Sequence, residues 1–244
     1  MSHSALAHQT VEPVDGAAAD VGAAGLDPAA NTSSGRPEIV TQHESVAKRA
    51  LDMVLAGGGL LVSAPVWLVL AAAVKLEDGG PVFYGQERVG RGGRCFKSWK
   101  FRSMRPRESN EGPLLQANLE EHRITRIGRL MRATALDEMP QLWNIFVGDM
   151  SFVGPRAILP EEVVGGGEGT VSVTEVEGYS ERYSIRPGLT GLSQVTLARD
   201  ATHRHKFRVD CLYVRRRTFW LDVKLIAQSV WVSLRGAWPG IGKG

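Results

Sequence analysis

The longest apolar run in the chain lies between Asp52 and Lys75, where 22 consecutive residues carry no charge. At a rise of about 1.5 Å per residue, a straight helix of this length can cross the hydrocarbon core of a bilayer. Pro65 lies in the middle of the run, and a proline inside a helix removes a hydrogen-bond donor and clashes with the preceding turn. The pattern therefore predicts an apolar helix with a kink.

Basic residues flank the apolar run on both sides; they are Lys48 and Arg49 before it and Lys75, Arg88, Arg91 and Arg94 after it. Because Lys and Arg concentrate on the cytoplasmic side of a membrane, this pattern does not place the two ends on opposite faces. A re-entrant helical hairpin over residues 48–76 accounts for both the kink and the basic residues at the two ends. In this arrangement the Ser63 hydroxyl is expected to bond a backbone group that Pro65 leaves unpaired. A kinked full span and a buried core helix are the alternatives.

The hydrophobic period changes after this run. Residues 80–104 alternate polar and apolar positions around Gly-rich turns, which predicts short strands. Residues 119–146 have helical character, and four arginines recur there at every third position, roughly on one side of the helix: Arg123, Arg126, Arg129 and Arg132. This stripe fits either a solvated face or a face that binds headgroup phosphates.

A last helix is expected over residues 215–238, a mostly apolar segment with Trp220, Trp231, Trp238 and basic ends. Tryptophan and arginine suit a membrane interface, although core packing explains Trp220 and Trp231 about as well. Together these elements predict an α+β fold that is mainly helical.

Composition separates a polar tail from one folded unit. Residues 1–44 are rich in Ala, Gly, Pro, Asp and Ser without an amphipathic period, so we expect a disordered tail there and a single domain over residues 45–240. The tail holds six acids and one base, so the remainder has 28 bases and 20 acids and favours anionic partners. The two cysteines, Cys95 and Cys211, form no disulfide framework and fit a reducing compartment.

Two adjacent carboxylates, Asp137 and Glu138, precede Pro140 in a mostly apolar segment. Neighbours on a helix diverge by roughly 100°, so the pair is expected to divide its tasks. One carboxylate would attack or abstract a proton while the other holds Mg²⁺, which prefers oxygen ligands and often shares substrate phosphates. Acids before a proline are also typical of a plain helix N-terminus.

Basic residues beside prolines, glycines and predicted strands are candidates for phosphate binding: Arg88, Lys100, Arg102, Arg156 and Arg186. Rigid turns such as GPR and RPG can present a guanidinium bidentately to a phosphate. Handling of a pyrophosphate beside a membrane would use these cations, a metal and a carboxylate nucleophile together. A non-catalytic surface charge is the alternative for each of them taken singly.

Three stretches in the same order and spacing carry a resemblance to a known family. They are KRALDMVLAGGGLLVSAPVWLVLAAAVKLEDGGPVFYGQERVGRGGRCFKSWKFRSM, LDEMPQLWNIFVGDMSFVGPR and RPGLTGLSQV. From about Lys48 to Leu234 the chain resembles the bacterial sugar transferases, the monotopic polyprenyl-phosphate phosphoglycosyl transferases. The resemblance implies a monotopic membrane protein with a re-entrant helical hairpin and amphipathic interfacial helices around a small cytoplasmic catalytic core, at the inner membrane.

The resemblance also implies an activity. Asp137 would attack the β-phosphorus of a UDP-sugar and release UMP; the phosphosugar would then pass from Asp137 to undecaprenyl phosphate, in a reaction that needs Mg²⁺. Glu138 would act at the metal with Asp137. Lys100, Arg102 and Arg156 would contact phosphates or nucleotide, as would Arg186 and Gln194. UDP-glucose or UDP-galactose is the expected donor, for exopolysaccharide or another glycoconjugate.

The sequence departs from the family in one place. Serine often stands directly before the proline at the membrane bend, whereas here Ala64 fills that position and Ser63 lies one residue earlier. Longer family members carry further transmembrane helices and another domain, so this chain resembles the minimal form. Two other functions stay open: a nucleotide-sugar pyrophosphate hydrolase and a non-catalytic basic membrane scaffold. Nucleic acid is not expected as a partner, and monomer and homodimer remain open.

Overall fold

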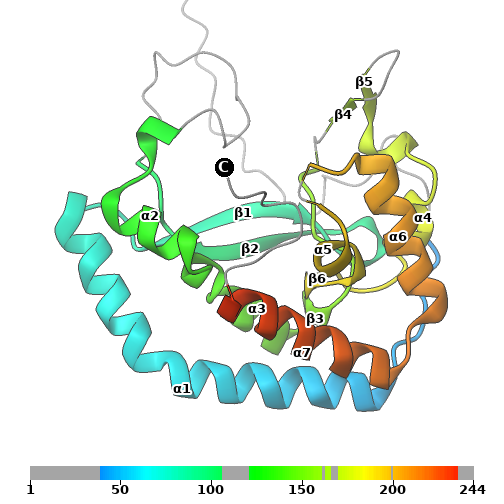
Figure 1. Ribbon diagram of the computed structural model, residues 1–244, viewed down its shortest axis with the longest axis horizontal. Helices are drawn as coiled ribbons and strands as arrows, with labels where there is room; N and C mark the ends of the chain where they lie inside the picture. Colours follow the sequence, from blue (N-terminus) through cyan, green and yellow to red (C-terminus); the bar gives the residue numbers. More distant parts are fainter. Residues whose placement is uncertain (1–38, 106–120, 161–162, 166–169, 199, 236–244) are drawn as a thin grey trace, which may run out of the picture. The chain divides into compact units, whose positions relative to one another are not determined.

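The computed structural model describes residues 39–105, 121–160, 163–165, 170–198 and 200–235. Its helices are α1 (Val46–Asp78), α2 (Arg126–Ala133), α3 (Gln141–Val147), α4 (Tyr179–Arg182), α5 (Leu192–Thr196), α6 (His203–Arg216) and α7 (Phe219–Arg235). Its strands are β1 (Phe83–Val89), β2 (Cys95–Phe101), β3 (Ser151–Val153), β4 (Val163–Gly165), β5 (Thr170–Ser172) and β6 (Gly188–Thr190). The chain is thus mixed and mostly helical, as the sequence predicts (Figure 1).

Helix α1 is one continuous helix that bends in its middle part (Figure 1). It begins at the N-cap Ser45, whose side chain accepts a hydrogen bond from the Lys48 N–H, and ends at Gly79, which takes a left-handed conformation with φ of 71°. Pro65 lies inside it. The proline is therefore accommodated by bending one helix rather than by a gap between two helices.

The Ser63 hydroxyl does not meet the backbone group that Pro65 frees. A proline lacks the N–H that would bond the carbonyl four residues earlier, here that of Leu61. The Ser63 hydroxyl instead donates to the Leu60 carbonyl at 3.5 Å. The predicted hydroxyl-to-backbone bond thus exists as a long contact to a neighbouring carbonyl.

The apolar midsection of α1 has no protein cover. By length and composition, α1 could cross a membrane, and 17% of its most apolar stretch is buried within the protein. Leu61 and Val62 are 79% and 82% exposed. A buried core helix would hide such side chains, so that alternative is wrong.

Strands β1 and β2 form an antiparallel hairpin across the middle of Figure 1, as predicted for residues 80–104. Tyr84 pairs with Lys100 and Gln86 with Ser98, so these side chains share one face with Arg88. The turn between the strands contains Gly92 and Gly93 with φ of 69° and 75°, a conformation that favours glycine.

The helical stretch predicted over residues 119–146 is interrupted. Helix α2 ends at Ala133, and the next residue, Thr134, donates its hydroxyl back to the Leu130 carbonyl at 2.9 Å. Ala135 then adopts φ of 56°, and residues Leu136–Glu138 form a 3₁₀ helix, η3, before α3 begins. Two helices and a tight corner therefore replace the single helix.

Side-chain hydrogen bonds dock α3 on the free edge of β2. Asn144 of α3 donates to the Lys97 carbonyl at 2.8 Å and accepts from the Trp99 N–H at 3.0 Å. The amide thereby satisfies backbone groups that an edge strand leaves unpaired. This contact places η3, which precedes α3, next to β2.

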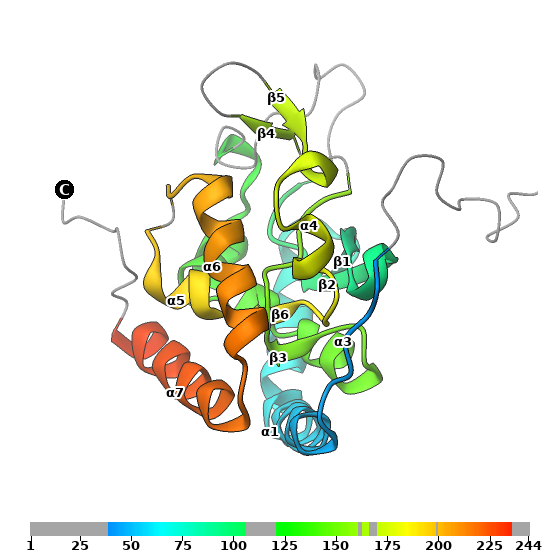
Figure 2. The same ribbon diagram turned by 90° about the vertical axis from the view of Figure 1, so that its right-hand side faces the viewer.

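A close crossing of backbones joins β3 to β6, which pair in parallel. A Cβ atom on Gly188 would lie 2.1 Å from the Gly154 nitrogen, so only glycine fits there. Helices α4, α5 and α6 lie together beside this crossing, and β4 and β5 form a separate small hairpin (Figure 2).

The helix predicted over residues 215–238 is split, because α6 ends at Arg216 and α7 begins at Phe219. Trp220 is 76% exposed and Trp231 is also exposed, which favours the interfacial interpretation over core packing. Trp238 lies outside the described residues.

The expected tail includes a segment that is held in place. The Gln42 N–H donates to the Ser184 carbonyl at 2.9 Å, and Glu44 is ion-paired with Arg186. Residues 39–44 therefore belong to the folded unit. Residues 1–38, for which disorder is predicted, lie outside the described residues.

Candidate functional site

Four of the predicted site residues line one pocket: Arg88, Lys100, Glu138 and Arg156. They come from β1, β2, η3 and the loop after β3, so segments far apart in the sequence meet here. Three cations around one carboxylate make a pocket suited to an anionic ligand that also brings or shares a metal. The pocket is the candidate active site.

The hairpin places two of these cations. Lys100 pairs with Tyr84, and Arg88 lies four residues after Tyr84 on the same strand. Because side chains alternate between the two faces of a strand, Lys100 and Arg88 lie on the same face of the β1–β2 ribbon. Arg88 donates to the Ala157 carbonyl at 3.1 Å and to the Gln86 side chain at 2.6 Å. Its guanidinium is therefore fixed against the loop that carries Arg156.

Glu138 is the anionic centre of the pocket. Its carboxylate accepts a hydrogen bond of 2.5 Å from Lys100 and lies 3.5 Å from Arg156. Burial alone would raise its pKa, but the charges of Lys100, Arg156 and Arg88 lower that pKa to about 2. Glu138 is thus a stable carboxylate and a weak base.

Asp137 lies in different surroundings, although it is the adjacent residue. Its side chain is buried, and burial raises its pKa, while the charge of Lys100 opposes the change and that of Glu138 adds to it. Of the residues that the structure describes, none forms an ion pair with it. A buried carboxylate that forms no ion pair is a stronger base and nucleophile than a clamped one.

Backbone strain lies directly ahead of the two carboxylates. Ala135 is the one non-glycine residue with positive φ in the described part of the chain. A side chain in this region costs on the order of 1 kcal/mol, and such residues cluster at functional sites. The strained corner allows η3 to turn Asp137 inward and Glu138 toward the pocket.

The number of carboxylates in η3 matches the number that a Mg²⁺ ion shared with substrate takes from a protein. Within the described ranges, no group of three or more His, Cys, Asp or Glu side chains could hold a metal without help. Mg²⁺ commonly takes one or two carboxylates and fills its remaining positions with water and substrate phosphates. Glu138 lines the cationic pocket, whereas Asp137 is buried beside it in η3 and is not among the lining residues. A metal ion held by both carboxylates therefore stays a prediction.

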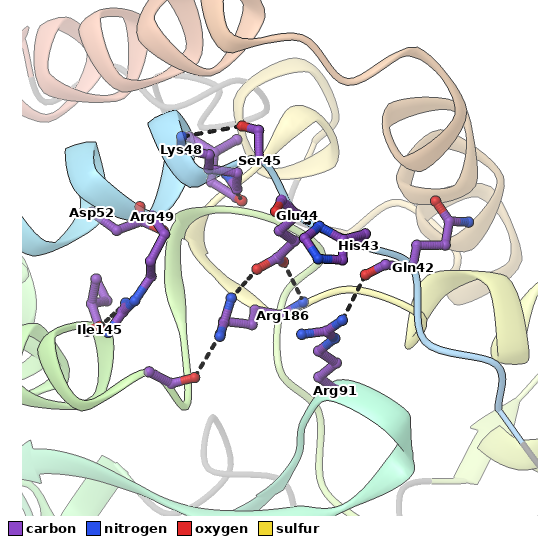
Figure 3. Close-up of polar contacts among 12 residues, drawn as sticks. Gln42, His43, Glu44, Ser45, Lys48, Arg49, Asp52, Arg91, Ile145 and Arg186 are labelled. Atoms are coloured by element: carbon purple, nitrogen blue, oxygen red, sulfur yellow. Dashed lines mark hydrogen bonds and ion pairs between the residues drawn. The ribbon is translucent and has the colours of Figure 1, made fainter.

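The remaining predicted contacts lie outside the pocket lining. Arg102 is ion-paired with Asp78 at the end of α1. Arg186 is ion-paired with Glu44 and donates to the Gly148 carbonyl at 2.7 Å (Figure 3). The structure thus gives both arginines partners within the protein, and their role toward substrate stays a prediction.

Gln194 is also engaged away from the pocket. Its amide nitrogen lies 3.5 Å from the Leu189 carbonyl, and its amide oxygen is buried without a hydrogen-bond partner. The backbone around Gly191 approaches closely enough that a Cβ there would lie 2.4 Å from this oxygen. A substrate role for Gln194 likewise stays a prediction.

Two polar residues of the pocket lining have no counterpart among the predicted contacts. Ser98 lines the pocket beside Lys100, and Gln141 lines it from the first turn of α3. A sequence signal existed for both: Ser98 is two residues from Lys100 on a strand, and Gln141 is three residues after Glu138 on a helical turn. Alternation and helical spacing could have found them.

Comparison with known proteins identifies one family. The profile described as "Bacterial sugar transferase" matches residues 43–236. A UDP-glucose:undecaprenyl-phosphate glucose-1-phosphate transferase of Klebsiella pneumoniae is 38% identical over 190 residues, covering 76% of this chain and 39% of the relative. The protein of the same name from Caulobacter vibrioides is 40% identical over 189 residues, covering 75% of this chain and 68% of the relative.

A shorter relative matches over nearly its whole length. The exopolysaccharide production protein PSS of Rhizobium leguminosarum bv. phaseoli is 37% identical over 191 residues, which cover 76% of this chain and 94% of the relative. The chain therefore spans about two fifths of the Klebsiella protein but most of the Rhizobium protein.

Proposed function

Because the chain belongs to the bacterial sugar transferase family, we propose that it transfers a sugar 1-phosphate from a UDP-sugar to undecaprenyl phosphate. The relatives from Klebsiella and Caulobacter are named for this reaction with UDP-glucose. Others are named for UDP-galactose and UDP-N-acetylgalactosamine. UDP-glucose or UDP-galactose is the proposed donor, and the product would enter exopolysaccharide or other glycoconjugate synthesis.

One observation carries the division of roles: the two adjacent carboxylates have pKa values shifted in opposite directions. Opposed environments of this kind commonly separate a reacting carboxylate from a stabilising one. Asp137, buried and not clamped, is the proposed nucleophile. Glu138, held by Lys100, stays ionised and orients the cations and any shared metal.

The proposed reaction has two displacements at phosphorus. A carboxylate oxygen of Asp137 forms a bond to the β-phosphorus of the UDP-sugar, and the bond from that phosphorus to the bridging oxygen breaks, so UMP leaves. A phosphate oxygen of the polyprenol then attacks the same phosphorus and releases Asp137. The product is a lipid-linked diphosphosugar, and Asp137 returns to its initial state.

The pocket cations act on the donor. Arg88, Lys100 and Arg156 neutralise the diphosphate and hold the β-phosphorus near the corner of η3. Asp137 and Glu138 would hold Mg²⁺ together with the substrate oxygens, and the bound ion would neutralise charge that develops on the phosphates.

The two ends of α1 support attachment to one side of a membrane. Near its start, Lys48 donates to Asp222 of α7 at 2.8 Å. Near its end, Glu77 accepts hydrogen bonds from two backbone N–H groups of α2. Because both ends contact the same folded unit, we propose that the exposed apolar bend enters and leaves the cytoplasmic face of the inner membrane.

The test uses detergent-purified protein, Mg²⁺ and a panel of UDP-sugars, with and without undecaprenyl phosphate. Nucleotide products and intact protein mass are measured for the wild type and for Asp137→Asn. We expect UMP, a hexose-phosphate adduct on the wild type alone, and sustained turnover only with the lipid. The sugar that forms the adduct identifies the donor.

Two other outcomes would overturn the proposal. Sustained UMP release without lipid would indicate a nucleotide-sugar pyrophosphate hydrolase. Absence of turnover with every donor, together with salt-sensitive binding to anionic vesicles that is unchanged in Asp137→Asn, would indicate a basic membrane scaffold.

A further inference from the structure

The loop after β3 carries Arg156 into the pocket. The Arg156 side chain is half exposed and lies 3.5 Å from Glu138, so the backbone position of Arg156 limits where its guanidinium can be presented. Three consecutive carbonyls of this loop accept hydrogen bonds: Pro155 from the Gly188 N–H at 2.9 Å, Arg156 from the Arg182 side chain, and Ala157 from the Arg88 side chain at 3.1 Å. Two of the three donors are thus side chains that lie far from the loop in sequence.

Arg182 is the buried donor of this set. Its Nη2 donates to the Arg156 carbonyl, its Nε to Asp210 at 2.8 Å and its Nη1 to the Tyr183 hydroxyl at 2.7 Å. The guanidinium also lies over the rings of Tyr183 and Phe207, 5.0 Å and 4.6 Å from their centroids. Its orientation is therefore fixed by both edge and face contacts.

Asp210 fixes Arg182 from α6. The second oxygen of its buried carboxylate accepts a hydrogen bond of 2.5 Å from Ser193 of α5. The network thereby connects three helices to the backbone of the pocket loop. Well-packed apolar residues often stabilise a protein as much as a buried ion pair does, or more. The pair of Arg182 and Asp210 is therefore better explained by the position in which it holds the Arg156 carbonyl than by a contribution to stability.

We propose that Arg182, oriented by Asp210, is a positioning residue for the donor substrate. It holds the Arg156 backbone so that the Arg156 guanidinium faces the diphosphate of a nucleotide sugar. Neither Arg182 nor Asp210 contacts substrate in this arrangement. The inference rests on the proposed function, because it assigns Arg156 to the donor.

The first test is Arg182→Lys, assayed for initial rates and for UDP affinity by calorimetry with the full chain in detergent. Lysine keeps the charge, but one ammonium cannot reproduce the planar fork that serves Asp210, Tyr183 and the Arg156 carbonyl at once. We expect KM for the UDP-sugar and Kd for UDP to rise about tenfold, the effect of losing one charge-assisted hydrogen bond, while kcat changes little.

A double-mutant cycle separates positioning from general destabilisation. If Arg182 acts through Arg156, then Arg182→Lys in the Arg156→Gln background should change KM by less than about twofold. The matched control is Thr125→Ala, which removes the buried N-cap of α2, a side chain outside the pocket lining that accepts from the Gly128 N–H at 2.9 Å. We expect this control to lower Tm and leave KM unchanged.

The outcomes are distinguishable. An unchanged KM in folded Arg182→Lys, or a full effect of this change in the Arg156→Gln background, overturns the positioning role. If Arg182→Lys does not fold, Ser193→Ala removes one hydrogen bond to Asp210 and is expected to raise KM in the same way; an unchanged KM in that variant overturns the role equally. A wild type that neither binds UDP nor releases UMP overturns the proposed function instead.

Discussion

Asp137 and Glu138 are neighbours in the chain, yet their carboxylates contribute to stability with opposite signs. Lys100 and Arg156 stabilise ionised Glu138 and lower its pKa, whereas burial of Asp137 raises its pKa and disfavours its charge. A lowered carboxyl pKa stabilises the folded state at neutral pH, and a raised one destabilises it. The site therefore combines a residue that stabilises the fold with one that costs stability.

Substitution of Glu138 by Gln should destabilise the protein at pH 7. The pKa shift from 4.5 to about 2, discounted because the side chain is partly exposed, corresponds to roughly 1–3 kcal/mol. This contribution is complete above pH 4.5 and is lost as the pH falls toward 2. The difference in Tm between wild type and Glu138→Gln, measured in detergent, should thus be constant above about pH 4.5 and shrink as the pH falls toward 2. A constant difference would contradict the assignment.

Asp137→Asn should have the reverse effect. A neutral amide of the same shape removes the cost of burying a charge, so Tm should rise at pH 7. The gain should vanish as the pH falls below 3.8, the ordinary pKa of an aspartate, where the carboxyl is protonated in both the folded and the unfolded state. Thermal unfolding of both variants on one pH series provides the comparison, and a lower Tm for Asp137→Asn at pH 7 would contradict the burial argument.

The sequence predicted individual pocket residues better than their partners. Lys100 and Glu138 meet at 2.5 Å, as expected for a pocket that holds both charges. The partners of Arg102 and Arg186 were not predicted, because Asp78 and Glu44 lie 24 and 142 positions away in the chain. No local spacing signals ion pairs that only the folded topology creates.

At the scale of elements, local hydrogen bonds decided where the predicted helices end. The amphipathic pattern continues through residues 119–146, but Pro140 offers no N–H and Thr134 returns its hydroxyl to the preceding turn. The corner at Ala135 then depends on tertiary contacts that hold a strained backbone. Periodicity therefore predicted helices and strands but not the corner that carries the two carboxylates.

The crossing of β3 and β6 should not tolerate a side chain at Gly188. A Cβ atom there would lie 2.1 Å from the Gly154 nitrogen and 2.3 Å from the Thr190 carbonyl, both backbone atoms that cannot rotate away. We expect Gly188→Ala to destabilise the protein by about 1–3 kcal/mol or more. Gly188 also forms an isolated β-bridge with Arg156, which lines the pocket. UDP affinity should therefore fall as well.

Gly58→Ala is the matched control for this substitution. Nothing lies within 4 Å of a Cβ atom at Gly58 in α1, and alanine favours a helix over glycine by about 1 kcal/mol. The Tm of Gly58→Ala should equal or exceed that of the wild type. Equal Tm values for Gly188→Ala and Gly58→Ala would contradict the close crossing.

At the scale of the whole folded unit, α1 has two anchored ends and an uncovered middle. Arg49 donates to the Ile145 and Phe146 carbonyls at 2.7 Å each, where cations are favourable at the C-terminal end of α3. Leu70 and Val74 pack near the other end in a cluster with buried Phe101. A straight span would separate these ends by a bilayer thickness, so the contacts of both ends with one folded unit favour the proposed arrangement in which α1 enters and leaves the same face.

Both ends of α1 should therefore be accessible from one side of the membrane. Val40, 84% exposed ahead of α1, and the exposed Cys95 beyond it provide two positions for cysteine labelling. We expect a membrane-impermeant maleimide to label Val40→Cys, in a Cys95→Ser background, and native Cys95 in inside-out vesicles, and neither site in intact spheroplasts. Labelling of one site in each preparation would instead establish a full span.

The variant Pro65→Leu tests the cause of this arrangement. The bend allows both ends of α1 to reach the same folded unit, so a straightened α1 should move one labelling site toward the opposite face of the membrane.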